Sequence, residues 1–173
     1  MEGIFIEQLI KRKKSTKDIL TIILLIVCGI GFTPMALYYG FLLQYLGYVF
    51  LILLAGVWWF VVRIIKSKTV EYEYVFTEGT LDIDMIIGGS KRGRVITISK
   101  MELELMAPIS HPYNGEYKTL NCSTKDENDR LYYLITERHD VGKVRVLFNP
   151  NDKLIEAFKA YRPSVVITGE ENA

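Results

Sequence analysis

The chain has 173 residues, a formal net charge of +1 at pH 7, and charged side chains at 24% of its positions. This length accommodates one ordinary domain together with a membrane segment, and the near-neutral charge argues against a general nucleic-acid-binding protein. The charges are unevenly distributed. The segment from Ile19 to Val62 contains no Asp, Glu, Lys, Arg or His, whereas the remainder has the composition of a charged globular domain.

Residues 1–17 form a basic N-terminal segment in which apolar side chains precede the cluster Lys11–Lys14. Two interpretations remain open. The segment is either a short helix lying in the membrane interface with its lysines against anionic headgroups, or a frayed end whose lysines only set the topology.

The apolar segment is long enough for two membrane spans, since about 20 apolar residues cross the hydrocarbon core. Within residues 18–66 we therefore expect transmembrane helices at 19–39 and 42–64, joined by a turn near Gly40. A cleaved signal peptide is the alternative, but the apolar run is too long and no small-residue cleavage site interrupts it.

Basic residues flank both predicted spans, whereas the turn between them carries no charge. By the positive-inside rule this pattern predicts a two-span protein of the cell membrane with both termini in the cytoplasm. Cys28 then lies in the first span and Cys122 in the cytoplasmic part, so we expect both thiols to be reduced.

After Lys68 the apolar period changes to two, which is typical of β-strands. Val70–Phe76 and Leu81–Met85 flank a Glu78-Gly79 turn, and a second turn at 88–93 leads into a third strand. Further alternating segments bring the predicted number of strands to seven by Phe148.

The last predicted element is an amphipathic helix. Asn149 suits its N-cap and Pro150 its first position, and Leu154, Ile155, Phe158 and Tyr161 share one face. Residues 163–173 are expected to form a flexible tail.

These elements predict an α+β membrane protein. A transmembrane helical hairpin is followed, over residues 70–162, by a seven-stranded bent antiparallel sheet or partly open barrel with a C-terminal helix. The run "VFTEGTLDIDMIIGGSKRGRVITISKMELELM" is similar to the strand, turn, strand and basic "RxIxLxxI" pattern of bacterial PH-like domains, carried here by Arg94, Ile96, Ile98 and Met101. The whole chain also resembles small two-span bacterial membrane proteins.

The resemblance implies a binding site in the basic turn. In eukaryotic PH domains a loop near the open end of the barrel holds phosphoinositide headgroups with basic residues, and Lys91, Arg92 and Arg94 occupy a similar place here. These residues are candidates for contact with anionic lipid or an acidic partner. The alternative is a solvated turn.

Acidic residues mark a second candidate surface. A two-residue turn at Glu78-Gly79 would place Glu73 opposite Asp84, with Glu71 and Asp82 flanking them. This acidic face is either a cation- or partner-binding strip or an exposed face relieved by Lys100 or solvent.

The sequence carries no recognisable catalytic, cofactor or metal motif. Gly88-Gly89-Ser90-Lys91 lacks the spacing of a phosphate-binding loop, and His111, His139 and Cys122 do not have the spacing of zinc ligands. We therefore expect no enzyme activity, no cofactor and no metal.

The function that best fits these features is a membrane-anchored PH-like interaction module. It would hold a β domain at the cytoplasmic face and bind a protein partner or an anionic lipid surface. The alternative is an accessory or self-associating subunit of a transport or cell-envelope complex, and an enzyme of another type is the third possibility.

The uncharged segment generates a direct test. After cell lysis and high-speed centrifugation, the full-length protein should be in the membrane pellet, and tags at both ends should be inaccessible from outside intact cells. Recovery in the supernatant, or labelling of either tag from outside, would contradict the predicted spans.

Overall fold

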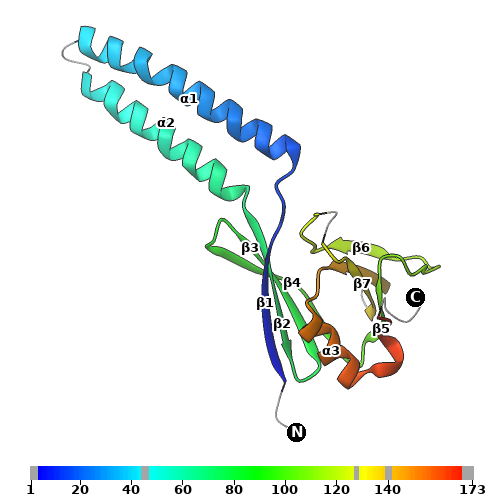
Figure 1. The fold of residues 1–173 in the computed structure, drawn as a ribbon. Coiled ribbons are helices and arrows are strands. Elements are labelled where there is room, and N and C mark those ends of the chain that lie inside the picture. Colours follow the sequence, from blue (N-terminus) through cyan, green and yellow to red (C-terminus); the bar gives the residue numbers. More distant parts are fainter. Residues whose placement is uncertain (1–3, 44–46, 127–128, 139–141, 169–173) are drawn as a thin grey trace. The chain divides into compact units, whose positions relative to one another are not determined.

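The computed structural model describes residues 4–43, 47–126, 129–138 and 142–168. The chain forms two compact units. One combines residues 1–13, 70–86 and 90–173 and contains the β domain, and the other combines residues 14–69 and 87–89 and contains two helices. The β domain is therefore discontinuous in the sequence, because the helices are inserted after its first strand (Figure 1).

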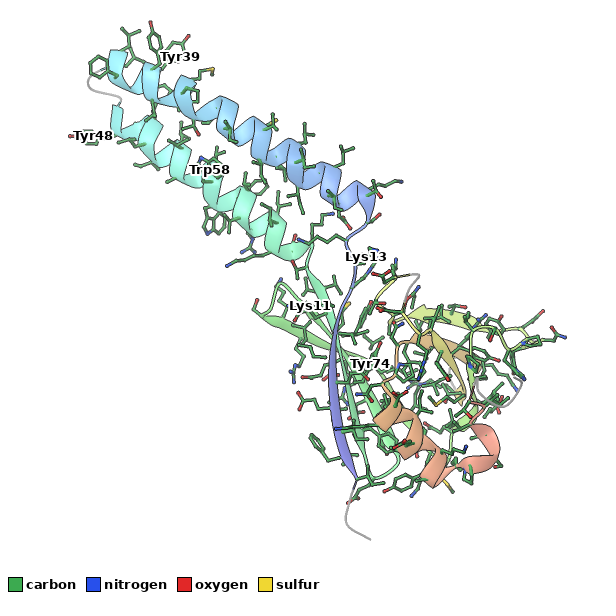
Figure 2. All side chains as sticks on the ribbon, in the orientation of Figure 1. Lys11, Lys13, Tyr39, Tyr48, Trp58 and Tyr74 are labelled. Atoms are coloured by element: carbon green, nitrogen blue, oxygen red, sulfur yellow. The ribbon has the colours of Figure 1, made fainter. Side chains whose placement is uncertain are left out.

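The helical unit consists of α1 (Thr16–Leu42) and α2 (Gly47–Ser67), both long and apolar enough to cross a membrane. Only 11% of the most apolar window of α1 and 6% of that of α2 are buried within the chain. A core helix of a soluble domain would be mostly buried, so this exposure fits helices whose apolar surface faces lipid. Tyr39 and Tyr48 lie near the connected end of the pair (Figure 2).

Polar and close backbone contacts join the two helices. The indole N–H of Trp58 donates a hydrogen bond to Thr33 Oγ1 at 3.2 Å, and the Thr33 hydroxyl donates to the Gly29 carbonyl at 2.8 Å.

The turn expected near Gly40 is not there, because Gly40 lies within α1. A Cβ atom on Gly47 would approach the Gly40 carbonyl oxygen to 2.8 Å, so only glycine fits at that position. The connection falls at 44–46, outside the described residues.

Both interpretations of the N-terminal segment, the interfacial helix and the frayed end, are wrong for Phe5–Lys11. Phe5–Lys11 forms strand β1, which pairs antiparallel with β2 (Val70–Thr77) in a register that places Lys11 opposite Glu71. Alternating burial explains the difference, because Ile6 and Ile10 pack on the core while Phe5, Glu7, Leu9 and Lys11 are exposed. A period of two buries one face of a strand, whereas a helix would have spread these apolar residues around its axis.

Two sheets make up the β domain. The first has the order β1-β2-β3-β4, in which β3 is Thr80–Ile87 and β4 is Lys91–Ser99. The second has the order β5-β7-β8-β6, and its strands are β5 (Leu103–Pro108), β6 (Lys118–Asn121), β7 (Tyr132–Arg138) and β8 (Gly142–Phe148). The seven strands expected after the spans are therefore present, with β1 in addition. One pairing differs from the expectation, since β6 runs parallel to β8.

The core lies between the two sheets and is closed by helix α3 (Asp152–Tyr161). Phe158 of α3 packs against Phe76, with ring centroids 4.7 Å apart. The Tyr74 side chain is fully buried, and its hydroxyl donates to the Cys122 carbonyl at 2.6 Å. Burial raises the pKa of Tyr74, so this phenol stays neutral and keeps its proton for that bond.

The N-cap of α3 differs from the expectation. Asn151, not Asn149, caps α3 by accepting a hydrogen bond from the Leu154 N–H. The Asn149 side chain is used elsewhere, since its oxygen accepts from the Thr124 N–H at 2.7 Å.

Up to residue 168, the segment after α3 is not the loose tail that the sequence predicted. Pro163–Val165 forms a 3₁₀ turn, and Val166 is buried beside Met106 of β5. Residues 169–173 lie outside the described part.

The inserted position of the helices generates a test of the fold. The Arg12 N–H donates to the Val70 carbonyl at 2.9 Å, so replacing residues 13–69 by Asn-Gly should give a soluble, folded β domain closed by a tight hairpin turn. A fragment beginning at Val70 lacks β1 and loses the burial of Ile10, worth about 1.5–3 kcal/mol, together with the packing of the half-buried Ile6. Urea unfolding should show the fragment to be much less stable, and equal midpoints would contradict the role of β1.

Candidate functional site

The basic and acidic residues singled out in the sequence pair with one another on the first sheet. Arg92 Nη2 lies 2.9 Å from Glu73 Oε1. Arg94 Nε lies 2.5 Å from Asp84 Oδ1, and its Nη1 lies 2.9 Å from Asp82 Oδ1. Two of the three predicted basic residues are therefore paired with three of the four predicted acidic residues.

The expected position of the basic residues is wrong. Lys91, Arg92 and Arg94 are not in a hairpin loop, because β4 already begins at Lys91 and the turn occupies only 88–90. Lys91 is exposed and makes no ion pair within the described residues. The fourth acidic residue, Glu71, is paired with Lys11 of β1 at 3.5 Å.

Burial explains why these arginines are needed. The side chains of Glu73 and Asp84 are only 8% and 10% exposed, and a carboxylate so little hydrated requires a partner. The hydrogen bond to Asp84 raises the pKa of Arg94, so the guanidinium stays charged. The arrangement neutralises charge on the sheet and leaves Lys91 as the remaining cation of the predicted basic site.

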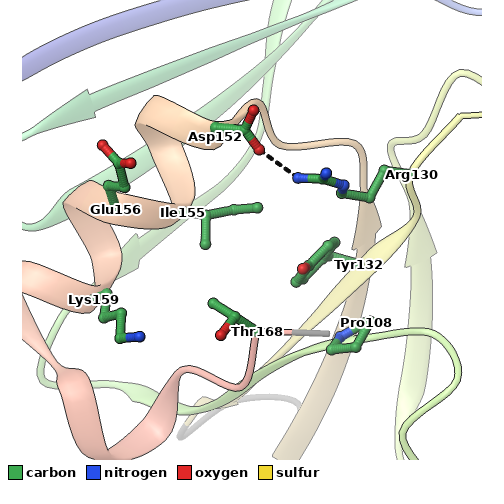
Figure 3. A pocket seen from close by; sticks show the side chains of 8 residues that line it. All are labelled: Pro108, Arg130, Tyr132, Asp152, Ile155, Glu156, Lys159 and Thr168. Atoms are coloured by element: carbon green, nitrogen blue, oxygen red, sulfur yellow. Dashed lines mark hydrogen bonds and ion pairs between the residues drawn. The ribbon is translucent and has the colours of Figure 1, made fainter. Parts of the chain in front are cut away.

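A groove of about 620 Å³ lies between α3 and the strands β5 and β7 (Figure 3). Its lining includes the apolar or aromatic side chains Pro108, Tyr132 and Ile155. Charged side chains surround them, with Arg130 paired to Asp152 and with Glu156 and Lys159 exposed on α3. Thr168 completes the lining.

The groove adjoins a strand edge that already holds an extended segment of this chain. Val166 forms a parallel bridge with Met106 of β5, and the Ile167 N–H donates to the Met106 carbonyl at 2.8 Å. The edge of β5 thus accepts backbone hydrogen bonds from an added segment, as in strand-addition complexes. An apolar floor between groups of both charges suits a peptide segment better than a single charged ligand.

A second cluster, which the sequence analysis missed, lies on the opposite face of the second sheet. Tyr133, Ile135 and Ala107 form a small core there. The guanidinium carbon of Arg145 lies 5.2 Å from the centre of the Tyr117 ring and 4.8 Å from that of Tyr133. Its Nη1 donates to the Tyr117 hydroxyl at 2.8 Å, so the cation is held by aromatic side chains of the domain itself.

The two remaining sequence candidates that lie in the described part of the chain, His111 and Cys122, have different surroundings. His111 lies beside Tyr133, with Nδ1 at 3.4 Å from the hydroxyl. Cys122 is buried in the main core, where burial raises the pKa of its thiol to about 11. His139 lies outside the described residues. The groove was also not predicted from the sequence, in which the polar side of the last helix was the only feature that pointed to it.

The fold and the site together define a class of protein, namely a β domain with a C-terminal helix carried by two helices that are apolar enough to cross a membrane. Residues 2–168 match the family model described as Bacterial PH-like domain (DUF6106), and the chain belongs to this family. The matched range includes β1 and both apolar helices. Searches of curated proteins and of solved structures gave no match.

The charge network generates a test by substitution. Arg94→Ser should lower the urea midpoint of the full-length protein in detergent, because Asp84 would remain buried without its partner. The matched control Lys91→Ser should leave the midpoint unchanged, since Lys91 is exposed. Joint replacement of Asp84 by Leu and Arg94 by Met should recover most of the loss. A Lys91→Ser effect as large as that of Arg94→Ser would refute this assignment.

Proposed function

We propose that the protein is a membrane-anchored PH-like module that binds an extended segment of a protein partner at the cytoplasmic face of the cell membrane. The groove beside α3 is the observation that carries this proposal. It offers an apolar floor, charged groups of both signs and an adjoining strand edge, and Val166 and Ile167 already use that edge.

Charge and apolar length support the membrane part of the proposal. The two inserted helices are apolar along their length, and the basic residues that flank them lie at the ends connected to the β domain, including Lys11–Lys14 and Arg63. This distribution favours a cytoplasmic β domain, with both termini on that side. The linkers to the helices are short, which would keep the domain near the headgroups.

The interaction role is favoured over the other roles considered. PH-like domains are generally non-catalytic interaction modules, which agrees with an assignment as a non-enzyme. Anionic lipid is the weaker partner, because Arg92 and Arg94 already bind carboxylates of the same sheet and only Lys91 remains to meet a headgroup.

The alternative role is an accessory or self-associating subunit of a transport or cell-envelope complex. Gly31 and Gly56 favour it, because a Cβ atom at either position would meet nothing within 4 Å. These glycines leave room for a further helix, whereas Gly29 and Gly47 are used within the pair, beside Trp58 and Gly40.

Position-specific cross-linking tests the groove. A photoreactive amino acid at Lys159 of the full-length protein should capture a defined partner in native membranes. The matched control at Lys153 is also exposed on α3 but does not line the groove, so it should not capture that partner. With the photoreactive group moved to Glu156, Lys159→Glu should lower the yield about tenfold, equivalent to about 1.4 kcal/mol of binding free energy.

Two outcomes would refute the groove as the binding site. One is the same cross-linked products from positions 153 and 159. The other is an equal cross-linking yield, with the photoreactive group at position 156, for the Lys159→Glu variant and for the protein that keeps Lys159.

A further inference from the structure

Among the described strands β1 has a neighbour on one side only, since it stands at the end of the order β1-β2-β3-β4. Two hydrogen bonds identify the groups that face β2. The Ile4 carbonyl accepts from the Glu78 N–H at 3.2 Å, and the Arg12 N–H donates to the Val70 carbonyl at 2.9 Å. Successive residues of a strand direct their backbone groups to opposite sides. The residues whose N–H and C=O point to the free edge are therefore Phe5, Glu7, Leu9 and Lys11.

The free edge ends at Lys13. The Lys13 N–H donates to the Thr124 carbonyl at 2.6 Å, on the side away from β2. This bond agrees with the alternation, because Lys13 continues the same odd-numbered series. The stretch available for a further strand therefore runs from Phe5 to Lys11.

The side chains of this stretch make its edge attractive to another strand. Phe5 is 62% exposed and Leu9 is 52% exposed, and Glu7 and Lys11 are exposed on the same face. The side chains between them point inward, and Gln8 is fixed by hydrogen bonds to Asn149 and Asn151. A seven-residue edge strand with exposed apolar side chains pairs readily unless it is blocked, and nothing in the described residues covers it.

We propose that β1 pairs antiparallel with β1 of a second copy of this chain, with Leu9 opposite Leu9 of the partner copy. In this register each Glu7 stands opposite Lys11 of the partner copy, so two cross-strand ion pairs flank a central apolar pair. The three pairs formed by Glu7, Leu9 and Lys11 are also those whose backbone groups point outward, so each pair can exchange two hydrogen bonds.

The charges select this register over its neighbours. A shift by one step of two residues places Glu7 opposite Leu9 and Phe5 opposite Lys11, which loses both ion pairs. A further shift places Glu7 opposite Glu7 of the partner copy, and like charges directly opposite are unfavourable. The pairing uses a different surface from the groove beside α3 and stands independently of the function proposed for that groove.

Cysteine cross-linking of the full-length protein in its membrane tests the register. In a background of Cys28→Ser and Cys122→Ala, Leu9→Cys should give a covalent dimer with a short bis-maleimide, because paired Cα atoms lie about 5.5 Å apart. Phe5→Cys is the matched control, since Phe5 is at least as exposed on the same face. It should give no dimer, because in this register the two copies of that residue are about 26 Å apart.

Charge exchange provides the second measurement in the Leu9→Cys chain. Glu7→Lys should lower the dimer yield about fivefold by placing lysines opposite each other, and adding Lys11→Glu should restore at least half of it. Lys153→Glu, a charge reversal on α3, should have no effect.

Equal cross-linking at positions 5 and 9, or no recovery in the exchanged variant, would overturn the proposed pairing. Lys159→Glu in the groove should leave the dimer yield unchanged, so the two proposals can fail separately.

Discussion

The antiparallel pairing of β1 with β2 joins two segments that are separated in the sequence by the entire helical hairpin. Lys11 stands opposite Glu71, and Ile10 reaches the core from a position before the first apolar helix. The helices thus take the place of the loop in a β-hairpin. Because loop length adds only slowly to the entropy of closing a hairpin, and the helices order most of the insert, β1 can complete the sheet despite this separation.

The outer face of the first sheet carries acidic side chains that are paired with basic ones. Its carboxylates alternate with the buried aromatic and aliphatic residues of β2 and β3, so folding brings several negative charges together. Arg92 and Arg94 of β4 offset them directly, and Lys11 of β1 does so at the edge. Charges that resemble a binding site in the sequence are therefore largely paired with one another in the folded sheet.

Two strand edges then remain as the features most suited to recognition. The edge of β5 is partly occupied by the C-terminal segment of the chain and borders the groove beside α3, whereas the edge of β1 is open from Phe5 to Lys11. Strand addition needs only unpaired backbone groups and a matching pattern of side chains. The domain therefore has one strand edge that its own C-terminal segment uses and one that is open.

The sequence by itself determined the features that depend on local pattern. The uncharged segment defined two apolar helices, alternation defined the strands from Val70 to Phe148, and the apolar stripe of Leu154, Ile155 and Phe158 defined the last helix. Only the tertiary structure decided what depends on contacts between distant segments. These include the conversion of Phe5–Lys11 into a strand, the use of Asn149 by Thr124 instead of the helix cap, and the pairing of Arg94 with Asp84. The groove belongs to the same group, because its lining comes from four separate segments whose proximity no local period encodes.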